Sequence, residues 1–147
     1  MGILKKGQKA PDFKLVGTDL QPITLADYKG KNLIVHFFPL AFTSVCTAQL
    51  CTANAEENDY TSLNAEVVGA SVDSPFVLEK FAKENDLKFK LGSDFNREVS
   101  KAFGVLFVDD FVGMTHFSMR SAFVIDKEGT IQYAEVTDGK TLPSFEK

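Results

Sequence analysis

The stretch that decides the fold covers residues 33–46 and reads LIVHFFPLAFTSVC. Its first part, residues 33–38, is almost continuously apolar and of strand length, and Pro39 stops it. This pattern predicts a central strand that is covered on both faces. From residue 43 to about residue 60 the composition turns to Ala, Gln, Leu, Glu and Asn, which predicts a helix directly after the strand.

Cys46 occupies a chemically special place in this arrangement. Thr43 is a good N-cap residue, so Cys46 is expected in the first helical turn. The backbone N–H groups there have no intrahelical partner, and their partial positive charge favours a thiolate. A thiol with a pKa of about 8.5 is only about 3% ionised at neutral pH, whereas a pKa of about 6 makes it about 90% thiolate.

The rest of the chain continues the strand and helix pattern. Residues 66–72 form a second apolar run, and Asp73 and Ser74 are assigned to the start of a helix with Pro75 at its first position and its end near Asn85. Strand, helix, strand, helix in this order predicts right-handed parallel crossovers. Gly104 is predicted to end a shorter helix that begins at Asp94 or Asn96.

Two hairpins and a loop complete the expected elements. The first hairpin is predicted from strands at residues 13–16 and 21–25, and the second from strands at residues 121–126 and 130–136. Residues 105–117 are predicted to form a loop. The sum is an α/β sandwich with a central mixed sheet, helices on both faces and an N-terminal hairpin, in one domain spanning residues 1–147. Cys46 is expected at the carboxyl end of a central strand, where open α/β sheets bind ligands.

Composition excludes several functions. The formal net charge is -4 and no dense run of Lys or Arg occurs, so a nucleic-acid partner is not expected. No apolar segment follows the N-terminal lysines, so neither a signal peptide nor a membrane span is expected, and a cytoplasmic protein is favoured. The two cysteines, Cys46 and Cys51, are too few for a disulfide scaffold. Together with His36 and His116 they lack zinc-site spacing, so no metal is expected.

The motif Pro-x-x-x-Thr-x-x-Cys, here Pro39, Thr43 and Cys46, resembles the active-site motif of the peroxiredoxins. The resemblance covers essentially the whole chain, including the stretches GQKAPDF, VDSP and RSAFVID. It implies a thioredoxin-like fold and a thiol peroxidase that reduces hydrogen peroxide and organic hydroperoxides without a cofactor. It also implies an arginine on a late strand beside the cysteine. Arg120 matches that position, and Arg97 does not.

The resemblance assigns a role to each of these residues. Cys46 is the peroxidatic thiolate that attacks the O–O bond and becomes a sulfenic acid. Thr43 interacts with the peroxide through its hydroxyl, and Arg120 stabilises the thiolate and the developing oxyanion. Pro39 shields the pocket from water. The implied reductant is a thioredoxin-like or similar dithiol protein.

Cys51 raises the question of how the sulfenic acid is resolved. The spacing Cys-x4-Cys resembles the bacterioferritin comigratory protein, or peroxiredoxin Q, branch, in which the second cysteine resolves the first. In an intact helix the two Cα atoms stand about 8.6 Å apart, and a disulfide needs less than about 7 Å. We therefore expect the first helical turns to unwind when a Cys46–Cys51 bond forms.

Several alternatives stay open from the sequence. Residues 37–43 also resemble one-cysteine peroxiredoxins of the alkyl hydroperoxide reductase E type, in which an external thiol resolves the sulfenic acid and Cys51 is incidental. A peroxide sensor that passes its oxidation to a partner would use the same thiolate. A disulfide oxidoreductase is disfavoured because Cys-x-x-Cys is absent. The resemblance also suggests a homodimer, and residues 142–147 resemble a shortened start of the family's terminal helix.

Overall fold

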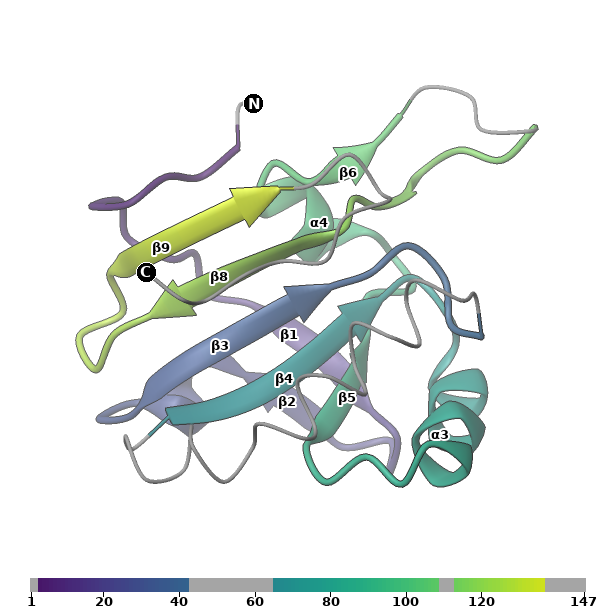
Figure 1. Cartoon of the computed structure of the whole chain (residues 1–147). Coiled ribbons are helices and arrows are strands. Elements are labelled where there is room, and N and C mark those ends of the chain that lie inside the picture. Colours follow the sequence, from purple (N-terminus) through teal and green to yellow (C-terminus); the bar gives the residue numbers. More distant parts are fainter. Residues whose placement is uncertain (1–2, 43–64, 109–112, 137–147) are drawn as a thin grey trace.

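A seven-stranded mixed sheet forms the centre of the part of the chain that the computed structural model describes, residues 3–42, 65–108 and 113–136 (Figure 1). Its strand order is β2-β1-β5-β4-β3-β8-β9. Strands β6 and β7 form a separate two-stranded sheet. The strands are β1 Lys14–Gly17, β2 Pro22–Thr24, β3 Asn32–Phe37, β4 Ala65–Ser71, β5 Lys90–Ser93, β6 Leu106–Phe107, β7 Phe117–Ser118, β8 Ser121–Ile125 and β9 Ile131–Val136. The described helices are the 3-10 helix η1 Leu25–Tyr28 and the α-helices α3 Pro75–Glu84 and α4 Glu98–Ala102.

The predicted central strand is confirmed. β3 pairs in parallel with β4, from Asn32 opposite Ala65 to Phe37 opposite Ala70. On its other side β3 pairs antiparallel with β8, where Phe37 is opposite Ser121. Because β4 also pairs in parallel with β5, the middle of the sheet has the parallel crossover arrangement that the sequence predicts.

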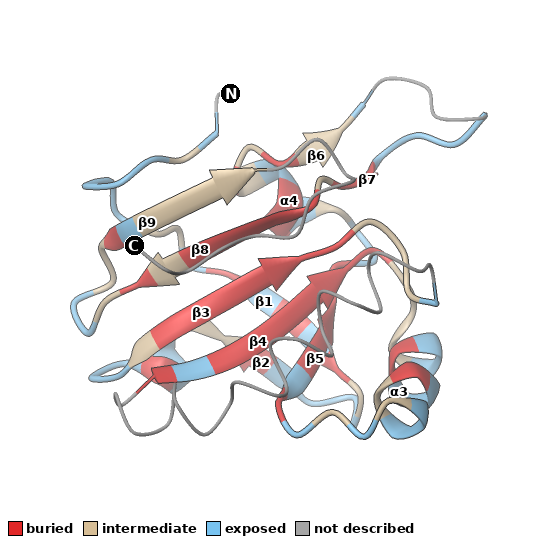
Figure 2. Cartoon of the chain, in the orientation of Figure 1, coloured by how far each residue is buried: buried red, intermediate tan, exposed pale blue. Residues whose placement is uncertain are grey.

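Nearly all residues of the central strands β3 and β4 are buried, as the red ribbons in Figure 2 show. Leu33, Val35 and Phe37 of β3 belong to one core cluster, which also contains Phe103 at the end of α4. Ile34, from the alternate side of the strand, belongs to a second cluster with residues of α3. The two described α-helices therefore cover opposite faces, and the expectation of helices on both faces is confirmed.

Local signals set the ends of α3. The Ser74 hydroxyl accepts a hydrogen bond from the Val77 amide at 3.2 Å, which makes Ser74 the N-cap, and Pro75 opens the helix. The C-cap is Asn85, where the sequence predicts the end of the helix. α4 is followed by Gly104, whose φ of +76° is one that glycine adopts without strain. The predicted C-terminal ends of both helices are thus confirmed, whereas the expected start of the second helix at Asp94 or Asn96 is wrong: α4 begins at Glu98 with Arg97 as its N-cap.

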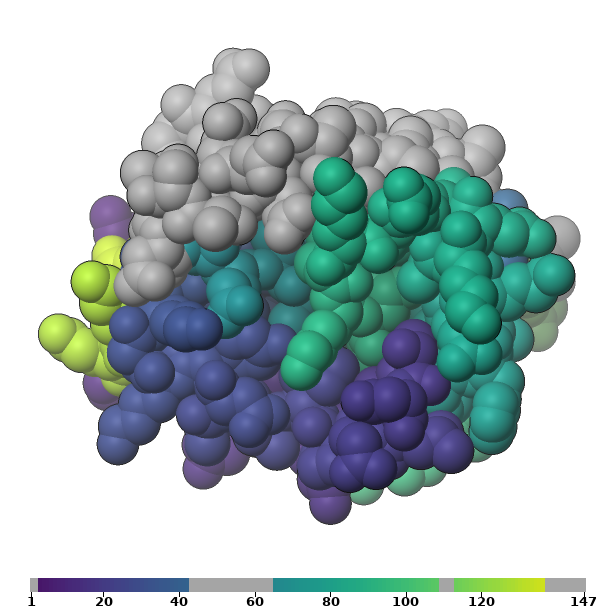
Figure 3. Space-filling model, turned by 90° about the horizontal axis from the view of Figure 1, so that it is seen from below, coloured from purple at the N-terminus to yellow at the C-terminus, as the bar shows by residue number. Residues whose placement is uncertain are grey.

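The two hairpins are confirmed as well. β1 and β2 pair antiparallel, and β1 also pairs with β5, so the dark purple hairpin in Figure 3 lies beside the teal segment around β5. β8 and β9 pair antiparallel through a turn in which the Asp126 carboxylate accepts hydrogen bonds from the amides of Glu128 and Thr130.

Two further features differ from the sequence analysis. β5 was not expected, because KLGS is short and its glycine lowers strand propensity; Gly92 is required there since a Cβ atom would approach Leu15 Cβ to 2.7 Å. The assignment of residues 105–117 to a loop is wrong in part. β6 and β7 pair there, with the rings of Phe107 and Phe117 stacked at 5.0 Å. Both strands have only two residues, too few for a periodic signal. The predicted helix from residue 43 to about 60 lies outside the described residues.

Phe103 is at the centre of the larger aromatic cluster and generates a stability prediction. Its ring contacts Phe13, Phe37 and Phe123 at centroid distances of 6.3, 5.2 and 5.0 Å, and its side chain is fully buried. Phe103→Ala should lower the free energy of unfolding by about 3–5 kcal/mol, because it removes apolar contacts and leaves a cavity. Chemical denaturation followed by circular dichroism measures the change.

The matched control for this substitution is Phe76→Ala. The side chain of Phe76 is 70% exposed, so its loss should change stability by no more than about 0.5 kcal/mol. Equal effects of the two substitutions would show that the cluster around Phe103 is not the dominant core.

Candidate active site

The chain leaves the sheet at Pro39. The Phe38 amide still donates to the Ala70 carbonyl at 3.0 Å, which extends the pairing of β3 with β4 by one residue. Pro39 has no N–H group to continue it, so the strand ends there. Residues 39–42 then cross the carboxyl ends of the parallel strands β3 and β4 (Figure 1). Pro39 thus lies at the end of the sheet where the sequence analysis expects the site.

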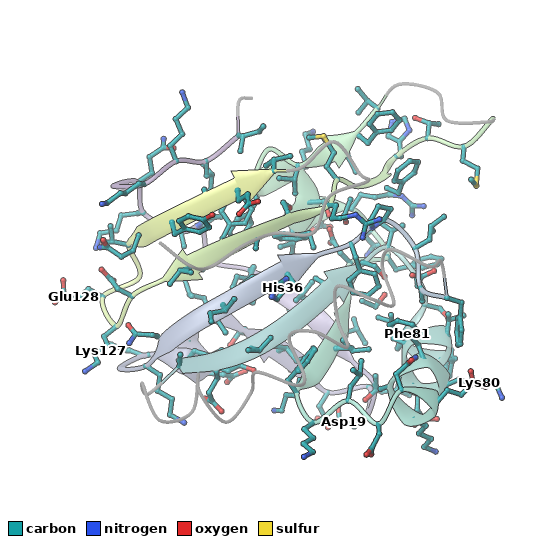
Figure 4. The ribbon with its side chains drawn as sticks, viewed as in Figure 1. Asp19, His36, Lys80, Phe81, Lys127 and Glu128 are labelled. Atoms are coloured by element: carbon teal, nitrogen blue, oxygen red, sulfur yellow. The ribbon has the colours of Figure 1, made fainter. Side chains whose placement is uncertain are left out.

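Phe42 ends this described segment in an unusual backbone conformation. Its φ is +69°, in the left-handed region that L-residues with large side chains rarely adopt. The Phe42 ring packs edge-on against Phe81 of α3 at 5.1 Å, and Phe81 also lies 6.0 Å from the ring of Phe38. Figure 4 shows Phe81 on the side of α3 that faces the sheet and Lys80 on the outer side. The contact with a fully buried ring helps to hold Phe42 in place.

Asp73 lies just beyond β4 and has a different role from its neighbour Ser74. Its Oδ2 accepts a hydrogen bond from the Ala41 amide at 2.7 Å and another from the Ser71 hydroxyl at 2.7 Å. The N-cap of α3 is Ser74. The assignment of both residues to the helix start therefore holds for Ser74, whereas the Asp73 side chain binds the segment that follows β3. A carboxylate directly after a buried apolar strand was the signal in the sequence for this role.

Arg120 lies at the same end of the sheet, one residue before β8. The register that places Ser121 opposite Phe37 brings Arg120 next to the point where the chain leaves β3. The residue is only 5% exposed. Since a guanidinium is protonated at all physiological pH values, Arg120 puts a permanent positive charge beside the end of β3. This is the kind of charge that stabilises a thiolate or an oxyanion.

The backbone around Arg120 is held on both sides. The Met119 amide donates to the Val105 carbonyl at 2.7 Å, and the Ser121 hydroxyl donates to the Met119 carbonyl at 3.0 Å. Ser118 and Ser100 are fully buried, and their hydroxyl oxygens are 2.6 Å apart. These bonds tie the segment that carries Arg120 to α4 and to the turn after it.

Arg97 does not contribute to this site through the contacts that the structure shows. It precedes α4 with a φ of +66°, its Nε donates to the His116 carbonyl at 2.9 Å, and its guanidinium lies 5.8 Å from the centre of the Phe95 ring. Its role is to join the start of α4 to the segment before β7. This agrees with the sequence analysis, in which Arg97 does not match the catalytic arginine.

The structure thus brings two of the five expected site residues, Pro39 and Arg120, to one end of the sheet. Thr43, Cys46 and Cys51 lie outside the described residues. Cys46 follows Phe42 by four positions, so the described segment 39–42 is the direct support of the expected nucleophile.

His36 and metal binding can be assessed in the described part of the chain. His36 is the penultimate residue of β3 (Figure 4), and burial lowers its pKa to about 4, so it is neutral near pH 7. Within the described residues no three His, Cys, Asp or Glu side chains come together as a metal site would require. Among the same residues no helix has the length and apolar character needed to span a membrane.

The shifted pKa of His36 generates a prediction for stability against pH. The unfolded chain binds a proton at this histidine below about pH 6.5, whereas the folded chain does so only below about 4. The histidine therefore makes the fold lose stability as the pH falls from about 6.5 to about 4, by up to about 3 kcal/mol.

Urea denaturation of the wild type and of His36→Gln at pH 7, 6 and 5 measures this effect. The wild type should lose stability across the series, and the variant should lose clearly less because Gln does not titrate. Parallel curves for the two proteins would contradict the assignment.

Comparison with known proteins agrees with this geometry. Residues 6–134 match the AhpC/TSA family. A putative peroxiredoxin of Mycobacterium tuberculosis is 40% identical over 133 residues, which cover 90% of this chain and 85% of the relative. Peroxiredoxin Bcp of Escherichia coli is 35% identical over 134 residues, which cover 90% of this chain and 86% of the relative. The crystal structure of peroxidoxin BcpB from Mycobacterium tuberculosis superposes with a TM-score of 0.84 at 26% identity, over 92% of this chain and 87% of that one.

A crystal structure of a peroxiredoxin-like protein from Aquifex aeolicus, at 24% identity, has a TM-score of 0.88 over 99% of this chain and 84% of that one, and it supports the fold. The thioredoxin-like peroxiredoxin fold expected from the sequence is confirmed by these structures. The chain therefore belongs to the AhpC/TSA family of peroxiredoxins and is a thiol peroxidase.

Proposed function

We propose that Cys46 is the peroxidatic residue of this enzyme, that Cys51 resolves it as an intramolecular disulfide, and that a thioredoxin-like dithiol protein restores both thiols. The substrates are hydrogen peroxide and small organic hydroperoxides. The proposed location is the cytoplasm, where dithiol donors keep thiols reduced. Two copies are proposed to pair through the face near the site, where the side chains of Phe42 and Phe95 are about half exposed.

In the first step the Cys46 thiolate attacks the terminal oxygen of the peroxide. The O–O bond breaks, sulfur gains the hydroxyl as a sulfenic acid, and the other oxygen leaves as an alkoxide or hydroxide that takes up a proton. Negative charge thus moves from sulfur to the leaving oxygen. Arg120 is assigned to stabilise that charge, and Thr43 to interact with the peroxide oxygens through its hydroxyl. Pro39 keeps water from the thiolate.

In the second step the Cys51 thiol attacks the sulfenic sulfur, forms the S–S bond and releases water. A dithiol donor then reduces the disulfide and is itself oxidised. Because an intact helix holds positions 46 and 51 too far apart for this bond, the step requires the helix to open locally.

The single observation that carries the proposal is the position of Arg120. Arg120 is buried and permanently charged, and the pairing of β3 with β8 places this residue beside the end of β3. Cys46 follows Phe42, the last described residue after β3, by four positions. Placing a charge in the interior is costly, so a buried arginine at this end of the sheet supports an electrostatic role for it.

Arg120→Ala tests that role. The pKa of Cys46 should rise and the second-order rate of reaction with hydrogen peroxide should fall by about a hundredfold, because charge on sulfur and on the leaving oxygen loses its partner. Stopped-flow mixing of the reduced protein with peroxide gives the rate, and absorbance of the thiolate against pH gives the pKa. The matched control is Arg97→Ala, which should change neither. A normal rate and titration in the Arg120 variant would contradict the proposed electrostatics.

Substitution of each cysteine tests the proposed roles of Cys46 and Cys51. Cys46→Ser should abolish peroxide consumption. Cys51→Ser should still react once but should accumulate sulfenic and then sulfinic acid, because nothing inside the chain resolves it. Mass spectrometry after one equivalent of peroxide distinguishes loss of two hydrogens, expected for the wild type, from gain of oxygen, expected for the Cys51 variant.

Other outcomes of the same experiment point to the alternatives. Unchanged recycling of Cys51→Ser by an added thiol would favour a one-cysteine peroxidase. A wild type that is oxidised once and not recycled by any dithiol donor would favour a peroxide sensor.

A further inference from the structure

Asp73 connects two segments that are far apart in sequence. The bonds from the Ala41 amide and the Ser71 hydroxyl both end on the same carboxylate oxygen, Oδ2, at 2.7 Å each. Ala41 is 32 positions away from Asp73 and belongs to the segment that leads from β3 toward Cys46. Hydrogen bonds to a charged acceptor are stronger than those between neutral groups, so this contact is a firm attachment for the segment.

Asp73 is itself fixed to the sheet. Its amide donates to the Ser71 hydroxyl oxygen at 3.2 Å, and its carbonyl accepts from the Ser93 hydroxyl at 2.6 Å. Ser71 and Ser93 are buried and lie opposite each other in the pairing of β4 with β5. The sheet therefore holds the Asp73 carboxylate in place, and the carboxylate can in turn position the segment that contains Ala41.

The segment that Asp73 holds needs such support. Phe42 has a left-handed backbone, which is unfavourable for an aromatic residue and persists only where the surroundings enforce it. Two contacts do so: the Asp73 carboxylate holds the amide of the preceding residue, Ala41, and Phe81 packs against the Phe42 ring. Strain of this kind is concentrated at functional sites.

We propose that Asp73 is a positioning residue for the peroxidatic reaction, acting through its hydrogen bond to the Ala41 amide. The proposal rests on the proposed function of Cys46. Ser74 caps α3 without help from Asp73, so the carboxylate is not required for that helix. A small displacement of a reacting group lowers a reaction rate by a large factor. Release of the Ala41 amide should therefore lower mainly the rate of the reaction with peroxide.

A series of substitutions at Asp73 tests this. Asp73→Asn can accept both hydrogen bonds through its single amide oxygen and should react with peroxide within about threefold of the wild-type rate. Asp73→Ala accepts neither and should be slower by about tenfold to a hundredfold. Stopped-flow mixing with hydrogen peroxide measures the rates at a temperature where circular dichroism shows each variant folded. Ser74→Ala is the matched control, because it weakens the neighbouring helix cap and should leave the peroxide rate unchanged.

A second reaction separates positioning for peroxide from loss of the thiolate. Alkylation of Cys46 by iodoacetamide requires a thiolate but no aligned peroxide, so Asp73→Ala should lower the peroxide rate by a much larger factor than the alkylation rate. Because iodoacetamide also alkylates the thiols of an unfolded chain, the two rates are compared only under conditions where circular dichroism shows each variant to be folded. If Asp73→Ala does not fold, Asp73→Glu, which keeps the charge and displaces the oxygen, decides the question by the same ratio.

A peroxide rate for Asp73→Ala equal to that of the wild type would overturn the proposal, and so would an Asn variant as slow as the Ala variant. Failure of the proposed function is recognised separately, by peroxide consumption that survives Cys46→Ser.

Discussion

The pairing of β3 with β4 on one side and β8 on the other is the constraint on which the site depends. Phe37 is opposite Ala70 in one ladder and opposite Ser121 in the other. Pro39 and Asp73 come two and three residues after Phe37 and Ala70, and Arg120 comes one residue before Ser121, so three distant parts of the sequence meet here. A shift of register by one residue would exchange the β3 side chains between the two core clusters, so the packing of both clusters also fixes which residues meet at the end of the strand.

Buried polar residues are concentrated where those three segments meet. Within the described residues, every buried polar or charged residue except His36 belongs to segments joined by hydrogen bonds at or next to this end of the sheet: Ser71, Ser93, Asp94, Ser100, Ser118, Arg120 and Ser121. The amide of Asp94 donates to the Ser71 carbonyl, and its carboxylate accepts from the amides of Val99 and Ser100. Burial of polar groups is costly unless they are bonded, so this end of the sheet is a connected polar framework in an otherwise apolar interior.

Backbone strain is found in the same region. Phe42, Arg97 and His116 all have left-handed backbones, and the last two are joined by a hydrogen bond from the Arg97 side chain to the His116 carbonyl. Such residues remain in place because packed rings and hydrogen bonds hold them. The proposed local opening for a Cys46–Cys51 disulfide would then take place beyond a segment that these contacts hold in place.

The sequence by itself determined the elements with strong local signals. The apolar run before Pro39, the Ser74-Pro75 helix start, the glycine after α4 and both hairpins were predicted correctly, because strand burial, capping and turn chemistry depend on neighbours along the chain. The motif with Cys46, together with the match of Arg120, was enough to identify the family. The short strands β5, β6 and β7 were missed, since their stability comes from partners distant in sequence.

Only the tertiary structure decided what holds the site together. The sequence placed Asp73 beside the helix start because Ser74 and Pro75 follow it, and the fold instead brings its carboxylate to the amide of Ala41. A hydrogen bond between residues 32 positions apart leaves no periodic trace in the chain, because it exists only once the sheet has set the ends of β3 and β4 side by side.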